Sequence, residues 1–317
     1  MTAAVRARKM VITITMYLQV WKRKGGALEQ RLGRNPLATA SYLGFIGDLH
    51  GDVGHLLEAV RALHSSGVKV AIVTGDFGFV WPGVNYKRTL DKLGRRLTAL
   101  GVTLYFVDGN HEWFPELDSY SSDGDGLRRL RTNIIHLPRG YRVVLASGKV
   151  LAALGGANSI DREEREKGSD WWPSESITEE DLSALGYEHA DLLVGHDAPV
   201  RVPSLDWALA ANTLNLTDEM LAYSLAGRRL LTRGVMAVRP SVFIGGHYHR
   251  FADELVEFDC FDSPFSVRVV ILDQVGPRHV CLAVLDVESL ELDFGSFTSL
   301  GANVSRGGRS CDDVSLA

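Results

Sequence analysis

The chain contains five short apolar runs, most of them closed by glycine and a polar residue, at residues 42–46, 68–73, 103–107, 192–194 and 242–244. Runs of this length that are rich in β-branched residues are typical of strands buried on both faces of a sheet. Between several of these runs lie stretches with apolar residues at helical spacing, residues 53–64 and 86–100. Strand, glycine turn, helix and strand in this order predict an α/β fold.

The pattern changes in the middle of the chain. Three further apolar runs, residues 134–137, 141–145 and 150–153, are joined by short turns that contain glycine. Such turns predict hairpins, so the sheet is expected to be mixed. The arginine cluster Arg128–Arg131 before them is interpreted as the solvated face of a helix.

Later segments return to helices and strands. A capping-box pattern at residues 176–179 predicts the start of a short helix, and a longer helix is expected over residues 217–236. Strands are predicted at residues 267–272 and 280–285. The ordered pattern therefore predicts three segments: a poorly structured N-terminal extension (1–40), one domain (41–295) and a disordered, Gly- and Ser-rich tail (296–317).

Composition limits the partners of the chain. Lys plus Arg number 34 and Asp plus Glu number 39, which gives a formal net charge of −5. A mildly acidic chain has no general attraction for nucleic acid or anionic lipid, so neither is an expected partner. The longest apolar run, residues 10–21, is shorter than the about 20 residues that span a bilayer. Three scattered cysteines form no disulfide framework, and we therefore expect a cytoplasmic protein.

Polar motifs follow five of the predicted strands, at the carboxyl ends where ligands gather in α/β sheets. Their side chains are two carboxylates, four imidazoles and one amide: Asp48, His50, Asp76, Asn110, His196, His247 and His249. Each of these residues alone is explained as a turn former or a cap, but together they indicate a metal site. Oxygen and imidazole ligands without thiolate suit Mn²⁺, Fe or Zn²⁺. We therefore predict two divalent metal ions, with Mn²⁺ as the first choice.

The order of these motifs, D-x-H, G-D, G-N-H-E, G-H and G-H-x-H, resembles that of the calcineurin-like metallophosphoesterase superfamily over residues 41–285. The resemblance implies an α/β fold in the form of a four-layer α/β/β/α sandwich, in which two mixed sheets are flanked by helices. It also implies the distribution of the ligands: Asp48, His50 and His249 on the first ion, Asn110, His196 and His247 on the second, and Asp76 on both.

Two further residues are candidates for contact with the substrate. His111 matches the family histidine beside the scissile phosphate, and the resemblance implies that it protonates the leaving oxygen. Support of a metal ligand is the other possibility for His111. In the charged, aromatic insertion at residues 157–176, Arg162 is a candidate phosphate ligand because a guanidinium binds phosphate bidentately. Trp171 and Trp172 either offer a stacking surface or pin the insertion into the core.

The substrate class stays open at this point. Residues 75–80 lack the second carboxylate and the arginine of the protein phosphatase branch, and residues 246–249 are similar to the phosphodiesterase-like branches. We expect hydrolysis of a phosphomonoester or phosphodiester by in-line attack of a metal-activated hydroxide. The partner is then a small phosphorylated substrate or a phosphoprotein. The alternatives are a catalytically silent metal-binding scaffold of the same fold, and a nuclease.

Overall fold

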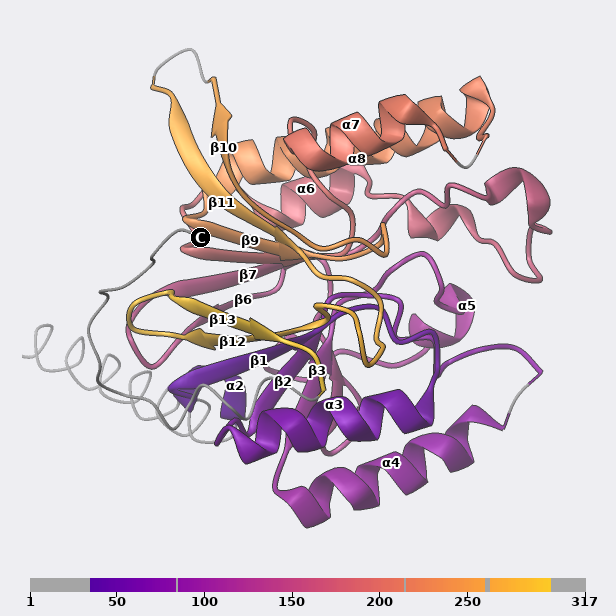
Figure 1. The fold of residues 1–317 in the computed structure, drawn as a ribbon. Coiled ribbons are helices and arrows are strands. Elements are labelled where there is room, and N and C mark those ends of the chain that lie inside the picture. Colours follow the sequence, from indigo (N-terminus) through magenta and orange to yellow (C-terminus); the bar gives the residue numbers. More distant parts are fainter. Residues whose placement is uncertain (1–34, 84, 214, 260–262, 298–317) are drawn as a thin grey trace, which may run out of the picture.

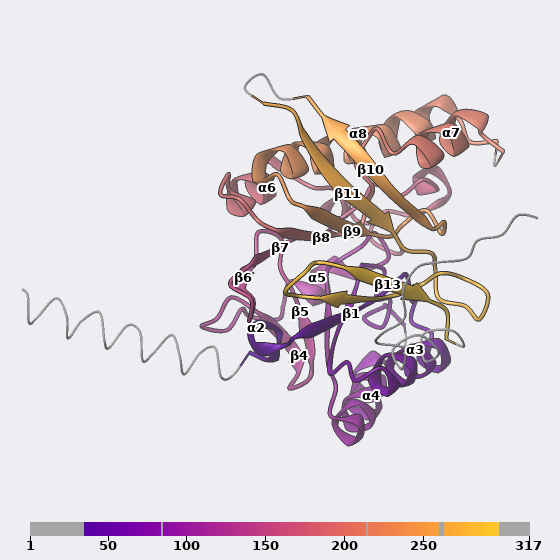
Figure 2. The ribbon, with the colours of Figure 1, turned by 60° about the vertical axis from the view of Figure 1, so that its left-hand side comes forward.

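Two mixed β-sheets face each other in the computed structural model, which describes residues 35–83, 85–213, 215–259 and 263–297 (Figure 1). The helices α3 (Val53–Ser65) and α4 (Tyr86–Leu100) cover the outer face of one sheet. The helices α6 (Glu179–Leu185) and α8 (Asp218–Val238) cover the outer face of the other. The predicted α/β/β/α sandwich is confirmed, and the same layers are visible after rotation in Figure 2.

The first sheet has seven strands among the described residues, in the order β13-β12-β1-β2-β3-β5-β4. They are β1 (Tyr42–Ile46), β2 (Val70–Val73), β3 (Thr103–Phe106), β4 (Arg128–Arg131), β5 (Ile134–His136), β12 (Leu282–Asp286) and β13 (Leu292–Gly295). β1, β2, β3 and β5 run parallel to one another. Because Ile46 lies opposite Val73, and Val73 opposite Phe106, the turns that follow β1, β2 and β3 emerge side by side.

The second sheet has six strands in the described part of the chain, in the order β10-β11-β9-β8-β7-β6. They are β6 (Arg142–Val144), β7 (Val150–Leu154), β8 (Leu192–Gly195), β9 (Val242–Gly245), β10 (Ala252–Phe258) and β11 (Phe265–Ile271). β7, β8, β9 and β11 are parallel neighbours. Their carboxyl ends therefore also share one edge.

Apolar side chains from both sheets fill the space between them. Phe45 and Ile72 of the first sheet and Val194 and Ile244 of the second are all 0% exposed. Burial of a side chain of this size stabilises the fold by about 1.5–3 kcal/mol. This packing holds the two sheets, and hence their carboxyl edges, in a fixed relation.

The remaining helices of the described residues are short. They are α2 (Pro36–Thr39), α5 (Phe114–Leu117), α7 (Pro203–Ala211) and two 3₁₀ turns, Arg162–Glu164 and Pro173–Glu175. No helix within the described ranges has the length and apolar character needed to cross a membrane.

The helices expected at residues 53–64, 86–100 and 217–236 are confirmed by α3, α4 and α8. The start of α6 differs from the prediction. Thr178 is its N-cap and forms the capping box with Asp181, so the box begins two residues later than expected. A capping box forms between an N-cap residue and an acidic residue three positions later. The sequence contains two such pairs, Ser176 with Glu179 and Thr178 with Asp181, and the second one starts the helix.

One predicted hairpin is wrong. β5 pairs with β3 in the first sheet, whereas β6 pairs with β7 in the second. The turn at residues 138–140 is therefore the crossing point between the sheets, with the buried side chains of Leu137 and Tyr141 on either side of it. The second hairpin, between β6 and β7, is confirmed. Turn composition alone does not distinguish the two cases, because both turns contain glycine.

The arginine cluster is also not a helix face. Arg128–Arg131 form the edge strand β4, in which Leu130 is 3% exposed. Arg129 pairs with Asp123 and Asp125, and Arg131 pairs with Asp91. Charged side chains on an edge strand are common because they discourage pairing with another chain. β10, β13 and α7 were not predicted. In β10 the alternation is broken because Glu254 lies half-buried on the inner face and Leu255 is exposed on the outer face.

The first described residues belong to the fold, so the predicted boundary at residue 41 is wrong for residues 35–40. Leu37 is fully buried between the sheets. Asn35 Oδ1 accepts hydrogen bonds from Leu37 N at 3.1 Å and from Tyr105 OH at 2.8 Å, and its Nδ2 donates to Tyr141 OH at 2.9 Å. The rest of the predicted extension (1–34) and nearly all of the predicted tail (298–317) lie outside the described residues.

Substitution of Asn35 is expected to destabilise the protein. Asn35→Ala leaves two buried tyrosine hydroxyls without this partner, so the free energy of unfolding should fall by about 1–3 kcal/mol. Chemical denaturation measures the change. Thr39→Ala, at an exposed position of the same helix, is the control and should change stability by less than about 0.5 kcal/mol. Equal stability of the two variants would contradict this prediction.

Candidate metal centre

Five polar turns meet at the edge where the parallel strands of both sheets end. They follow β1, β2, β3, β8 and β9 and carry the predicted site residues: Asp48 and His50, Asp76, Asn110 and His111, His196, and His247 and His249. The turns are adjacent because the strands before them are neighbours in register within each sheet. Carboxyl ends of parallel strands are the usual place for a ligand site in such folds.

The potential ligand atoms form two clusters that share Asp76. One contains Asp48, His50, Asp76 and His249, and the other contains Asp76, His196 and His247, with all ligand atoms of a cluster within 4.8 Å of one another. Asn110 joins the second cluster, since its Oδ1 lies 3.2 Å from His196 Nε2. The structure thus brings together all seven residues that the sequence predicts as metal ligands.

Ligand atoms without hydrogen-bond partners show that these residues fit two divalent cations. Asp48 Oδ1 and His247 Nε2 are buried and accept no hydrogen bond among the described residues. His50 Nε2 and His249 Nε2 lie 2.9 Å apart, so two ring nitrogens converge on one point. Leaving a buried polar atom without a partner costs about 1–3 kcal/mol. Carboxylate, amide and imidazole donors without thiolate are the ligand set of hard to borderline divalent ions.

Asp76 and His196 form a buried ion pair at the centre, with His196 Nε2 3.2 Å from Asp76 Oδ1. Burial opposes ionisation of Asp76, but His196, His111 and His50 together lower its pKa well below the usual range. Burial likewise disfavours charged His196, but Asp76 and Asp48 raise the pKa of His196 to about 10. This shift reflects the negative potential of two buried carboxylates, and the same potential attracts a cation.

Two glycines allow the ligands to approach this closely. Gly75 has φ +104°, and a Cβ there would lie 2.2 Å from His196 Nδ1. A Cβ on Gly246 would lie 2.2 Å from Asp48 Oδ1. Any side chain at either position would push a ligand out of the centre.

Left-handed backbone conformations are concentrated at the ligands. His50, Asp76 and His249 have φ of 47°, and His247 has φ of 75°. Such conformations cost of order 1–3 kcal/mol for residues other than glycine, and they persist where the surrounding structure fixes them. Strain of this kind is typical of functional sites.

The insertion after β7 holds the Asn110 side chain in one orientation. Asn110 Nδ2 donates to Ser159 Oγ at 3.1 Å, and Ser159 Oγ donates to Glu175 Oε2 at 2.5 Å. A serine that gives its only proton to a carboxylate can only accept from the amide. The amide NH₂ therefore faces Ser159, and Oδ1 is left for His196 and a cation. The sequence did not indicate this role of Ser159 and Glu175.

Glu175 is well placed for this task because it is 0% exposed and accepts several hydrogen bonds. Its Oε1 accepts from Ser159 N at 2.9 Å and from Tyr223 OH at 3.0 Å. Burial raises the pKa of Glu175, whereas the hydrogen bonds from Ser159 and Tyr223 favour its ionised form. These contacts fix the carboxylate on which the orientation of Asn110 depends.

His111 lies at the rim of the centre and contacts an arginine that the sequence did not single out. Arg165 Nη2 is 2.7 Å from His111 Nε2, which must accept, since a guanidinium only donates. Asp161 binds the same guanidinium through both carboxylate oxygens, each at 2.8 Å. Burial lowers the pKa of His111, which favours its neutral form. Proton donation by His111 stays a prediction, and this contact favours a different role.

Arg162 occupies a different position from the one expected of a phosphate ligand. Its side chain is exposed, and its guanidinium lies 5.1 Å from the ring centre of Trp171 and 4.7 Å from that of Tyr223. Arg165, three residues later, is the arginine beside the metal centre, with a side chain 8% exposed. Phosphate binding by Arg162 stays a prediction that its position does not favour. The insertion has no periodicity, so the sequence could not separate the two arginines.

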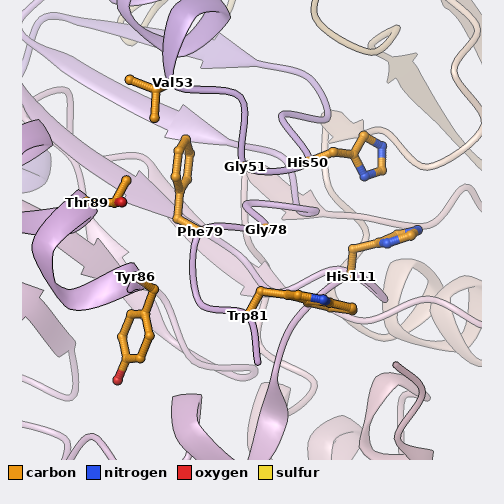
Figure 3. Close-up of a pocket in the computed structure, with 9 residues that line it drawn as sticks. All are labelled: His50, Gly51, Val53, Gly78, Phe79, Trp81, Tyr86, Thr89 and His111. Atoms are coloured by element: carbon orange, nitrogen blue, oxygen red, sulfur yellow. The ribbon is translucent and has the colours of Figure 1, made fainter. Parts of the chain in front are cut away.

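Two cavities border the metal centre, and His111 lines both. The smaller, of about 370 Å³, is lined by His50 and by the aromatic residues Phe79, Trp81 and Tyr86 (Figure 3). The larger, of about 660 Å³, is lined by His247, His249, Arg165 and residues of α7 and α8. Both volumes fall within the about 300–1,000 Å³ of small-molecule sites.

Comparison with known proteins agrees with these features. A family model described as calcineurin-like phosphoesterase matches residues 42–251, about two thirds of the chain. No curated protein matches.

Three solved structures are similar to this chain at low sequence identity. TT1561 of Thermus thermophilus is 14% identical, with 81% of this chain and 99% of that chain covered and a TM-score of 0.47. A second crystal structure is 15% identical over 81% of this chain and 99% of that chain, with a TM-score of 0.50. A structure described as a novel archaeal phosphodiesterase is 12% identical over 80% of this chain and 98% of that chain, with a TM-score of 0.36.

Loss of the Ser159 hydroxyl is expected to weaken the second metal site selectively. Ser159→Ala frees the Asn110 amide to rotate, and affinity for the second ion should fall about 10–100-fold. Titration calorimetry of metal-free protein with Mn²⁺ measures both sites. Ser159→Thr keeps the hydroxyl and should restore affinity. Ser176→Ala is the matched control, because Ser176 Oγ bonds Asn158 and Tyr223 in the same network without touching Asn110. Unchanged affinity in Ser159→Ala would refute the role of Ser159.

Proposed function

Because the chain belongs to the calcineurin-like phosphoesterase family, we propose that it hydrolyses a phosphomonoester or phosphodiester at a centre of two divalent metal ions. Members of this family are generally hydrolases that use two such ions. One observation carries the proposal: Asp76 belongs to both clusters of potential ligands. A shared carboxylate keeps two ions close together, which is what in-line displacement at phosphorus requires.

The ligand set supports Mn²⁺ as the first choice of metal, with Fe and Zn²⁺ as alternatives. Asp48, His50 and His249 would hold one ion, Asn110, His196 and His247 the other, and Asp76 both. When bound, the two ions would supply Lewis acidity and lower the pKa of a water. Burial lowers the pKa of His247 well below its usual range, so this side chain is a neutral donor over the physiological pH range.

The protein groups around the centre would position the phosphate. Arg165 lines the larger cavity beside His111. Its Nη2 and Nε are engaged by His111 and Asp161, so Nη1 would be the nitrogen that donates to a phosphoryl oxygen. Asp161 and His111 hold the guanidinium in place. We propose that His111 acts chiefly as the acceptor that orients Arg165.

Two alternatives are less well supported. A silent scaffold of the same fold is expected to have lost ligands, whereas all seven predicted ligands are present here. A nuclease is disfavoured by the net charge of −5. As a partner we propose a small phosphorylated molecule or a phosphoprotein. We propose the cytoplasm as the location because the three cysteines are scattered and the described one, Cys281, is an unpaired, buried thiol.

Removal of the shared carboxylate tests the proposed function. Wild-type protein should bind two ions and hydrolyse p-nitrophenyl esters of phosphate. Asp76→Asn should lose both ions and at least about 100-fold in turnover, whereas His249→Ala should lose mainly the first ion. Metal analysis and steady-state kinetics give the readouts. His64→Ala, an exposed histidine on α3, is the control. Two bound ions and normal turnover in Asp76→Asn would overturn the proposal.

Two substitutions of His111 separate orientation of Arg165 from proton donation. Glutamine retains an acceptor but cannot act as a general acid, whereas alanine removes both properties. We expect His111→Gln to stay within about threefold of wild type, and His111→Ala and Arg165→Gln each to lose about 10–100-fold on aryl and alkyl phosphates alike. A loss of about 10²–10⁴-fold in His111→Gln that is confined to alkyl phosphates would support proton donation instead.

A further inference from the structure

We infer that the substrate is a phosphodiester whose two ester groups occupy the two cavities beside the metal centre. The inference rests on the proposed phosphoesterase activity and selects between the two ester classes. His50, His111 and His249 form the rim between the cavities, with ring centroids 4.7 Å apart for His50 and His111 and 4.9 Å for His50 and His249. A phosphate bound at this rim has space for an organic group on each side.

The smaller cavity is suited to a flat group. Trp81 lies beside His111, with ring centroids 6.2 Å apart (Figure 3). It packs edge-on against Trp172, with ring centroids 5.7 Å apart. Phe79 and Tyr86 complete an aromatic wall. An aromatic or otherwise flat substituent gains stacking as well as burial on such a wall. A phosphomonoester whose organic group lay in the larger cavity would leave this wall unused.

The larger cavity is suited to a bulkier, partly apolar group. α7 contributes Leu205, Ala208 and Leu209, and α8 contributes Met220. These residues face the cavity that His247 and His249 also line, so the apolar wall is continuous with the metal centre. Both cavities therefore adjoin the same ligands from different sides.

The charge around the centre also favours a diester. The guanidinium of Arg165 is paired with Asp161 through two contacts of 2.8 Å. The other charged residues of the larger cavity outside the metal clusters, Glu164 and Arg250, balance each other in sign. A phosphodiester carries one negative charge, whereas a monoester dianion needs additional cations to offset its charge. The surroundings of the centre therefore match the less charged ester.

Three chromogenic substrates test the inference on the full chain with Mn²⁺ bound: p-nitrophenyl phosphate, methyl p-nitrophenyl phosphate and bis-p-nitrophenyl phosphate. We expect kcat/KM to be highest for the bis-ester, which has two aryl groups, and lowest for the monoester. Trp81→Ala removes the aromatic wall, and Ala208→Trp fills the larger cavity. Each variant should lower kcat/KM for the bis-ester about threefold to tenfold. Only one of them should do so for the methyl ester, which has a single aryl group.

Trp207→Ala is the matched control, since Trp207 is 70% exposed on α7 and lines neither cavity. Metal content and thermal unfolding of each variant verify that the centre and the fold are intact. A wild type that prefers the monoester, or variants that affect all three substrates equally or not at all, would overturn the inference. No turnover of any of the three substrates would instead reject the proposed function itself.

Discussion

The hydrogen bond between His196 Nδ1 and the carbonyl oxygen of Thr74, 2.8 Å long, joins the two sheets at the edge where the ligands gather. His196 follows β8 of one sheet, and Thr74 follows β2 of the other. Because the carbonyl can only accept, Nδ1 carries the proton and Nε2 is directed at Asp76. A side chain at position 75 would collide with this imidazole. The bond therefore fixes the ring with Nε2 toward the ligand cluster, and it links the two sheets at this edge.

The apolar core stabilises a metal centre whose buried charges and backbone conformations are themselves unfavourable. Burying Asp76 and His196 at 0–1% exposure opposes their ionisation, and four ligands have left-handed backbone conformations. The carboxylates and the imidazolium offset part of this cost by pairing with each other. The rest is carried by the apolar layer between the sheets and by the helices outside them. Each ligand lies on a turn within four residues of the end of a buried strand, so the rigid sheets hold the turns that form the centre.

The sequence predicts a residue's role well when neighbouring residues indicate it. Asp48, Asp76 and His196 each follow an apolar run and a glycine, so a few consecutive residues indicate the strand end, the turn and the ligand. Arg165, Ser159 and Glu175 have no such context, because their roles depend on how the insertion folds over Asn110. The crossing between β5 and β6 was missed for the same reason. Its glycine turn is compatible with a hairpin, and only the packing of Leu137 and Tyr141 between the sheets decides its direction.

Arg139 explains how an insertion without periodicity can orient a metal ligand. Its buried guanidinium pairs with Asp108, which follows β3 two residues before Asn110, at 2.7 Å. It also donates to the carbonyl oxygens of Ser174, Glu175 and Ser176 at 2.7–3.1 Å. Arg139 thus links the segment that contains Glu175 to the turn after β3 that contains Asn110. Burial alone would raise the pKa of Asp108, but Arg139 and His136 hold this pKa well below the usual range. Asp108 therefore stays ionised and paired with Arg139. The insertion is therefore a fixed wall of the centre, and it places Arg165 beside His111 on a rigid support.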